Sequence, residues 1–177
     1  MTSTRTIFFP WLALALASAA AAETTPAPEK ASPEFEAVKG LAGEWQGIAR
    51  AVHGAGEAKG LKTFASVRVV SAGSAVMLVT DPGTNHEMVT MFHRDDGGLV
   101  ATHYCSAMNQ PRMREVQPGE KGKLTFEFAD GTNLGTHPGH MQRLVVTLVD
   151  STHHTQEWTF LDGGKAQTMV FDMTRAK

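Results

Sequence analysis

Cysteine is almost absent from this sequence, since Cys105 is the only one among 177 residues. A disulfide within the chain is therefore excluded, and the fold must be stabilised by packing alone. An excess of charge of one sign is also lacking, because 16 Lys and Arg face 18 Asp and Glu, for a formal net charge of -2 at pH 7. Such a balance gives no electrostatic reason to expect nucleic acid or an anionic membrane as a partner.

The motifs of nucleophilic and nucleotide chemistry are missing as well. The sequence contains no Gly-x-Ser-x-Gly elbow, no phosphate-binding loop and no dinucleotide fingerprint. None of the eight histidines forms a His-Glu-x-x-His metal motif. The sequence therefore does not exclude catalysis, but it contains no motif that indicates it. A binding function is favoured over an enzymatic one.

The N-terminus has the outline of a signal peptide. Met1 to Arg5 is short and positively charged, and Ile7 to Ala20 is almost wholly apolar. Small residues up to Ala22 offer a cleavage site, so we predict a signal peptide over 1–22. The alternative is a retained anchor, but a membrane-spanning helix needs about 20 apolar residues. We expect a periplasmic or secreted protein without stable membrane insertion after cleavage.

The rest of the chain divides into a linker and one domain. Residues 23–33 are rich in Thr, Pro, Ala and Ser, a composition that predicts a disordered linker. Residues 34–177 fall within the usual size of a single domain. Apolar residues at positions 35, 38 and 41, followed by glycine, predict a short helix over Pro33–Leu41 at the start of this domain.

From Glu44 onward the pattern becomes that of an all-β protein. Short segments rich in β-branched and aromatic residues alternate with turn sequences such as Asp81-Pro82-Gly83 and Asp162-Gly163-Gly164. The expected strands span residues 44–53, 61–71, 74–80, 86–94, 98–106, 110–116, 122–129, 141–149, 153–161 and 165–175. Short turns predict a single antiparallel meander, and closure into a β-barrel of about ten strands would remove its exposed edges.

The start of the first strand reads Gly43-Glu44-Trp45-Gln46-Gly47. A Gly-x-Trp-x-Gly sequence after a short helix resembles the signature of the lipocalin, fatty-acid-binding and nitrobindin group of barrels. This resemblance implies a lipocalin-like barrel in which Trp45 packs across the closed end, with structural roles for Gly43 and Gly47. The nitrobindin branch also brings haem into consideration, but no matching motif surrounds His153 and His154, which we interpret as solvated residues beside a turn.

A second resemblance covers most of the domain. The strings Glu87 to His93, Thr102 to Cys105 and Asn109 to Met113, together with His140-Met141, are similar to a family of exported bacterial proteins of unassigned function. That resemblance implies a lipocalin-like (calycin or nitrobindin-type) barrel and no established activity.

His103 and Cys105 share one face of an extended strand, and Thr102 and Tyr104 share the other. If the first pair faces inward, the interior has an imidazole beside a thiol; if the second does, it has two hydroxyls. The sequence leaves both arrangements open. If His103 and Cys105 face inward, the simplest interpretation is that both are buried and chemically inert.

The run Asn109-Gln110-Pro111-Arg112 gathers amide and guanidinium groups where a simple strand would alternate. One interpretation is a polar recognition site in which Arg112 binds a carboxylate or phosphate. The other is a loop whose side chains cap backbone groups, with Arg112 paired to Glu87 or Glu115.

These residues together predict an exported protein that holds a partly apolar small molecule in its barrel. The candidate ligand contacts are His103, Tyr104, Asn109, Gln110, Arg112 and His140. One alternative is a metal- or haem-dependent barrel or enzyme, with zinc or iron ligands drawn from His103, Cys105 and His140. Another is a structural or protein-binding module with a filled barrel. The oligomeric state and the ligand's identity are left open.

Overall fold

The structure is a computed structural model that describes residues 32–53, 56–57, 60–96, 98–116 and 119–177. The predicted signal peptide lies outside the described residues, as does the predicted linker up to Ala31. Pro33, the boundary residue shared by the predicted linker and the predicted helix, is the first residue of a helix. Over the described residues, none of the helices has the length and hydropathy needed to cross a membrane.

The helix α1 (Pro33–Lys39) begins the domain and covers one end of it. Its N-terminus is capped by Ser32, whose hydroxyl accepts a hydrogen bond from the Phe35 backbone N–H at 3.2 Å. Phe35 and Val38 lie on one face of the helix and are buried in the same core cluster as Trp45. The predicted helix is therefore confirmed, and it exists because its apolar side chains have a barrel end to cover.

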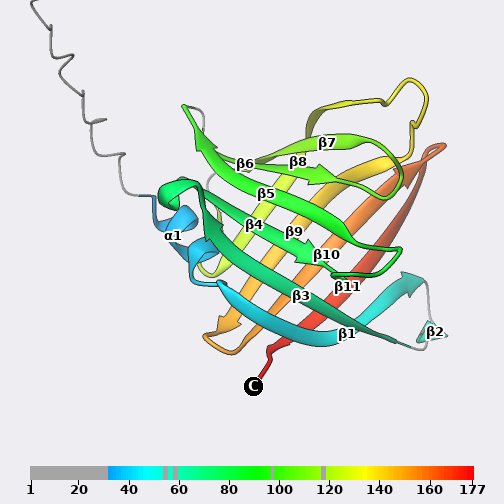
Figure 1. Ribbon diagram of the computed structural model, residues 1–177. Helices are drawn as coiled ribbons and strands as arrows, with labels where there is room; N and C mark the ends of the chain where they lie inside the picture. Colours follow the sequence, from blue (N-terminus) through cyan, green and yellow to red (C-terminus); the bar gives the residue numbers. More distant parts are fainter. Residues whose placement is uncertain (1–31, 54–55, 58–59, 97, 117–118) are drawn as a thin grey trace, which may run out of the picture. The chain divides into compact units, whose positions relative to one another are not determined.

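Within the described residues, eleven strands form one antiparallel sheet, and the last strand pairs with the first (Figure 1). The strands are β1 (Gly43–His53), β2 (Gly56–Glu57), β3 (Leu61–Val70), β4 (Ala75–Thr80), β5 (Met88–Asp95), β6 (Gly98–Tyr104), β7 (Gln110–Glu115), β8 (Lys123–Thr132), β9 (His140–Asp150), β10 (His153–Asp162) and β11 (Lys165–Arg175). A 3₁₀ turn, η1 (Ser71–Gly73), joins β3 to β4. Since β2 pairs only with β1, ten strands make up the closed ring.

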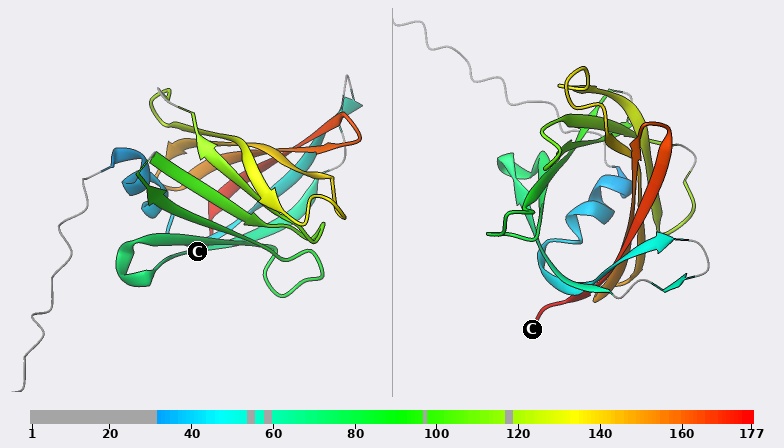
Figure 2. Two further views of the ribbon diagram at one scale, coloured as in Figure 1. Left: turned by 90° about the horizontal axis from the view of Figure 1, so that it is seen from above. Right: turned by 90° about the vertical axis from the view of Figure 1, so that its right-hand side faces the viewer.

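This closed meander of ten strands confirms the predicted fold class and is consistent with a lipocalin-like architecture. Each of the ten expected segments coincides with one long strand. The main difference is at β8, which continues to Thr132 because β7 pairs with it as far as Gln110, across an irregularity between Arg112 and Met113. The right-hand view in Figure 2 looks along the ring and shows α1 across its far end.

Closure of the ring depends on the residues around Trp45. Gly47 lies opposite Met173 of β11, and a Cβ atom on it would stand 2.0 Å from the Asp172 carbonyl oxygen. Trp45 is 1 % exposed, and its indole N–H donates to the Leu41 carbonyl at 2.8 Å. These contacts join β1, β11 and the end of α1, and they give the Gly-x-Trp-x-Gly sequence a packing role.

Candidate functional site

A cavity of about 190 Å³ opens inside the barrel, at the end opposite α1. Because β1 begins beside α1 and the strands alternate in direction, β4, β6 and β10 end at the opposite end, and β5, β9 and β11 begin there. These six strands supply the lining residues, which are Thr80, Met88, His103, Met141, Trp158, Phe160, Met169 and Phe171. The other half of the interior is filled by buried apolar side chains such as Phe92, Phe126 and Leu144.

The cavity is lined almost entirely by apolar groups. Three of its eight residues are methionines and three are aromatic, and only Thr80 and His103 are polar. None of the eight carries a full charge at neutral pH, because burial lowers the pKa of His103 to about 4. Methionine and aromatic walls with few polar groups are typical of sites for small, largely apolar molecules.

His103 provides the polar atom of greatest interest in this lining. The side chain is 2 % exposed, and its Nδ1 lies 2.9 Å from the Thr90 hydroxyl on β5. Its Nε2 is buried and has no hydrogen-bond partner among the described residues. A buried polar atom without a partner is costly, so it is a natural point of attachment for a ligand.

Trp158 forms the wall next to His103 and is itself held by a chain of hydrogen bonds. The two rings lie 4.9 Å apart, centroid to centroid, at 41°. The indole N–H of Trp158 donates to the Gln156 side-chain oxygen at 3.0 Å, and the Gln156 amide nitrogen lies 3.0 Å from His154 Nε2. The His154 ring in turn meets Trp45 edge-on at 4.3 Å. A series of hydrogen-bonded side chains thus runs along the inward face of β10, from the closed end of the barrel to the cavity.

His154 corrects our interpretation of the tandem histidines as solvated. It is fully buried, and burial, followed by the positive charges of His153 and Arg175, lowers its pKa to about 4. His153 is half-exposed and lies 2.7 Å from Asp172 on the outside. The alternation of side chains along the strand could have predicted that His154 is buried. His154 lies two residues before Gln156 and four before Trp158, so it shares their inward face.

The orientation of the 99–105 segment is now decided. Leu99, Ala101 and His103 face the core, whereas Tyr104 is 50 % exposed on the outside of the barrel. Cys105 follows the end of β6 and is half-buried, and burial raises the pKa of its thiol. The thiol therefore stays protonated at neutral pH, which does not favour a nucleophile.

Asn109 and Gln110 connect the loop before β7 to the 133–139 loop at the open end of the barrel. The Asn109 amide is buried and donates to the carbonyls of His137 and Gly139 at 2.7 and 2.6 Å. The Gln110 side-chain oxygen accepts hydrogen bonds from the Thr132 hydroxyl and the Asn133 amide. These contacts match the interpretation in which the amides cap backbone groups, and they brace the 133–139 loop beside the cavity.

Arg112 and His140 stand apart from the cavity lining. Arg112 is exposed and makes a two-point ion pair with Asp130, its cross-strand neighbour, rather than with Glu87 or Glu115. The His140 ring packs on Phe128 at 4.3 Å and its Nδ1 lies 2.6 Å from the Pro138 carbonyl oxygen. Of the predicted contact residues, the structure therefore brings only His103 into the wall of the cavity.

The metal candidates do not form a cluster. In the part of the chain that the structure describes, no three His, Cys, Asp or Glu side chains lie together as a metal site. His103 faces the cavity with its methionine and aromatic neighbours, while Cys105 and His140 are not among the lining residues. The donor set expected for zinc is therefore not assembled from these residues.

Comparison with known proteins supports the fold. Neither a protein-family model nor a curated protein matches the sequence. Among solved structures, a protein of unknown function from the DUF3598 family of Nostoc punctiforme PCC 73102 is similar with a TM-score of 0.55 at 12% identity, over 78% of this chain and 49% of that one. This chain thus spans about half the length of that relative. Rv2717c from M. tuberculosis is similar with a TM-score of 0.55 at 12% identity, over 82% of this chain and 99% of that one.

Proposed function

We propose that this chain is an exported binding protein that holds a small, partly apolar molecule in the cavity at the open end of its barrel. The observation that carries the proposal is a buried apolar cavity with the unpartnered His103 Nε2 in its wall. An apolar pocket with a few convergent polar groups is the usual form of a small-molecule site. The same cavity argues against the alternative of a structural module with a completely filled barrel.

The volume of the cavity sets the size of the ligand. Its 190 Å³ lies below the range of roughly 300–1,000 Å³ that is usual for sites of drug-sized molecules. An engineered apolar cavity of about 150 Å³ is known to hold benzene. The expected ligand is therefore about the size of one ring with a short substituent. A space of this size supports a single-ring ligand rather than haem, which has four linked rings.

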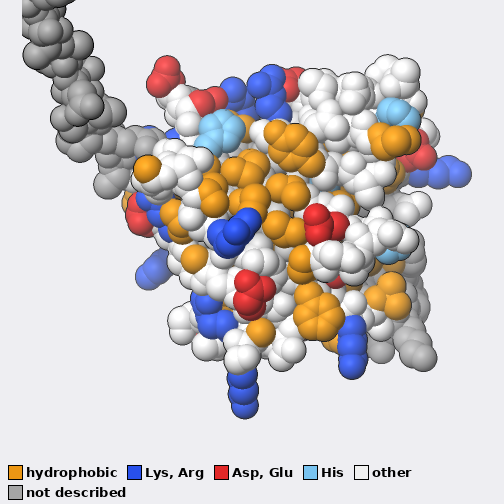
Figure 3. All heavy atoms as spheres, viewed as in Figure 1, with side chains coloured by type: hydrophobic (Ala, Val, Ile, Leu, Met, Phe, Trp, Pro, Cys, Tyr) orange, Lys and Arg blue, Asp and Glu red, His pale blue; other side chains and the backbone are white. Residues whose placement is uncertain are grey.

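The proposed location and the absence of nucleic acid or membrane partners rest on the sequence. We place the mature protein in the periplasm or outside the cell because of the signal peptide expected over 1–22. On the face drawn in Figure 3, basic and acidic side chains are interspersed. Ion pairs such as Arg112–Asp130 and Arg114–Asp95 on the barrel surface contribute to this mixture. A mixed surface supports a protein that binds neither nucleic acid nor anionic lipid through its charge.

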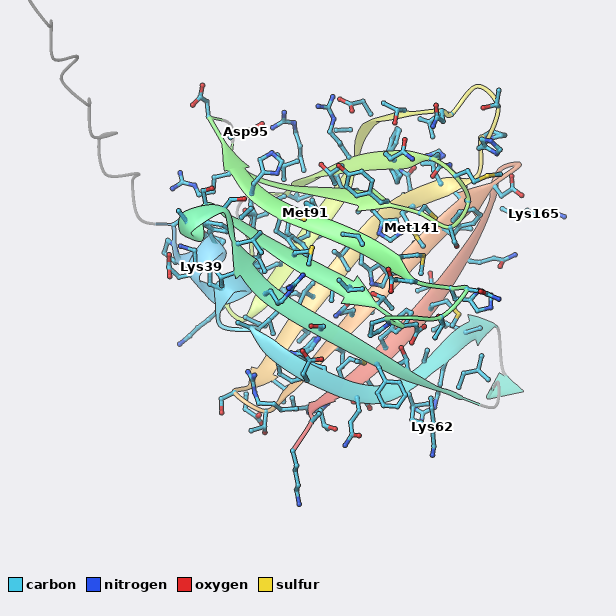
Figure 4. The ribbon with its side chains drawn as sticks, viewed as in Figure 1. Lys39, Lys62, Met91, Asp95, Met141 and Lys165 are labelled. Carbon is cyan, nitrogen blue, oxygen red and sulfur yellow. The ribbon has the colours of Figure 1, made fainter. Side chains whose placement is uncertain are left out.

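The test is native mass spectrometry of the protein purified from its own compartment, together with elemental analysis and a visible absorption scan. We expect a co-purifying organic mass without metal or a Soret band. Met141→Trp, which places a larger side chain in the cavity wall, should abolish that mass, whereas Met91→Trp on the outer face of β5 should retain it. Figure 4 labels both positions.

Two results would overturn the proposal. One is stoichiometric zinc, iron or haem in place of an organic molecule, which would move His103 from ligand contact to metal ligand. The other is a bound mass that survives Met141→Trp unchanged, since the occupied site would then lie elsewhere on the protein.

A further inference from the structure

The walls of the cavity favour a flat, polarisable ligand. Three thioethers, from Met88, Met141 and Met169, face the same space as the rings of Trp158 and Phe160. Methionine sulfur makes favourable contacts with aromatic rings, and aromatic side chains pack against other rings in offset or edge-on geometry. A single aromatic ring therefore uses both kinds of wall, and it matches the volume of the cavity.

The polar atom in the wall restricts the ligand's substituent. The contact between His103 Nδ1 and the Thr90 hydroxyl is compatible with either tautomer of the imidazole, so Nε2 is an acceptor in one and a donor in the other. A hydroxyl group can donate one hydrogen bond and accept two, so it pairs with Nε2 in both cases. A ligand without a polar group would leave this buried nitrogen unpartnered.

The charge of the lining excludes acids. No lysine or arginine is among the eight lining residues, and burial keeps the His103 imidazole neutral at pH 7 by lowering its pKa to about 4. A carboxylate moved into this space would lose its hydration without gaining a cation, and burial of an unpaired charge is strongly unfavourable. The cavity should therefore discriminate between a phenol and the corresponding benzoate, although the two are similar in size.

From these three restrictions, and resting on the proposed binding function, we infer that the cavity takes a neutral, hydroxyl-bearing single-ring compound of the phenol class, with the hydroxyl group on His103 Nε2. Trp158 packs beside the imidazole and lies in the same lining, so it contacts the ring of the ligand. Gln156 and His154 act as positioning residues, because their hydrogen bonds fix the Trp158 indole.

The experiment compares phenol, benzene and benzoate as ligands of the purified full-length mature protein by isothermal titration calorimetry at pH 7. We expect phenol and benzene to bind and benzoate not to bind. In His103→Phe the preference for phenol over benzene should fall at least tenfold, because a buried hydroxyl then has no partner. His93→Phe, the same exchange on the outer face of β5, should leave the preference unchanged.

A second readout uses the unaltered protein, in case His103→Phe does not fold. In imidazole ¹⁵N spectra, phenol should shift the Nε2 resonance of His103, and benzene should leave it in place. The inference is overturned if the two variants show the same preference, if benzoate binds as phenol does, or if phenol leaves the resonance unmoved. Benzene binding in any of these cases would still support the proposed function, whereas failure of both neutral rings to bind, together with a mass spectrum without bound material, would refute both.

Discussion

Mild acid should destabilise this barrel through two buried histidines. Burial lowers the pKa of His103 and of His154 from 6.5 to about 4. In the unfolded chain both imidazoles take up a proton as the pH falls below about 6.5, but in the folded protein they stay neutral until about pH 4. The stabilising contribution of each neutral histidine is therefore complete above pH 6.5 and is lost progressively as the pH falls towards 4.

The magnitude follows from the size of the shift. At about 1.4 kcal/mol per pH unit, the free energy of unfolding should fall by about 2 to 3 kcal/mol per histidine between pH 7 and pH 4.5, or about 5 kcal/mol for both. This is comparable to the whole stability of many domains, which is about 5–15 kcal/mol. The carboxyls of Asp130 and Asp150 have lowered pKa values and lose their contribution only below their ordinary value of 3.8, so a comparison at pH 4.5 isolates the histidines.

The assay is urea unfolding at pH 7 and pH 4.5, followed by the fluorescence of the buried Trp45 and Trp158. His103→Phe and His154→Phe should each remove about half of the acid-induced loss, whereas His93→Phe on the outer face of β5 should preserve all of it. An equal free energy of unfolding at the two pH values in the unaltered protein would refute the reasoning, as would an undiminished loss in a variant with both buried histidines replaced.

Two further predictions concern the backbone. Gly47→Ala should prevent closure of the ring and lower the free energy of unfolding by more than about 3 kcal/mol, because its Cβ would meet the Asp172 carbonyl at 2.0 Å. Gly135→Ala, with open space around its Cβ, should leave the urea midpoint unchanged, and equal midpoints for the two variants would contradict this account. Asn109→Ala should cost about 2 kcal/mol or more by leaving two carbonyls unpaired, and should speed hydrogen exchange in the 133–139 loop. Unchanged exchange would mean that the loop is held by other contacts.

Much of the fold could be predicted from the sequence because its determinants are local. Period-two alternation and short turns identified ten strands, and strands joined by short turns pair with their neighbours in sequence. The pairing of β1 with β11, which brings Trp45 opposite Arg175, is not local. Only the two family resemblances and the general disadvantage of exposed edges indicated closure.

The candidate site was less accessible to sequence reasoning. Alternation paired His103 with Cys105 and Thr102 with Tyr104, but Leu99 and Val100 are both apolar and did not decide which pair faces inward. In the 109–112 run, the polarity of the side chains is the basis for predicting ligand contacts. In the fold these polar groups pair with backbone carbonyls, with other side chains or with Asp130, and the cavity is lined instead mainly by residues that the sequence marked only as apolar.

The sequence by itself determined the secondary structure, the meander and the apolar character of the interior, because each depends on residue type and spacing along a short stretch of chain. Tertiary structure alone decided that the interior is filled beside α1 and hollow at the opposite end, and that His103 lies in the wall of the hollow part with an unpartnered nitrogen. The reason is that a cavity is the volume left between side chains from six strands, and no single stretch of sequence contains that quantity.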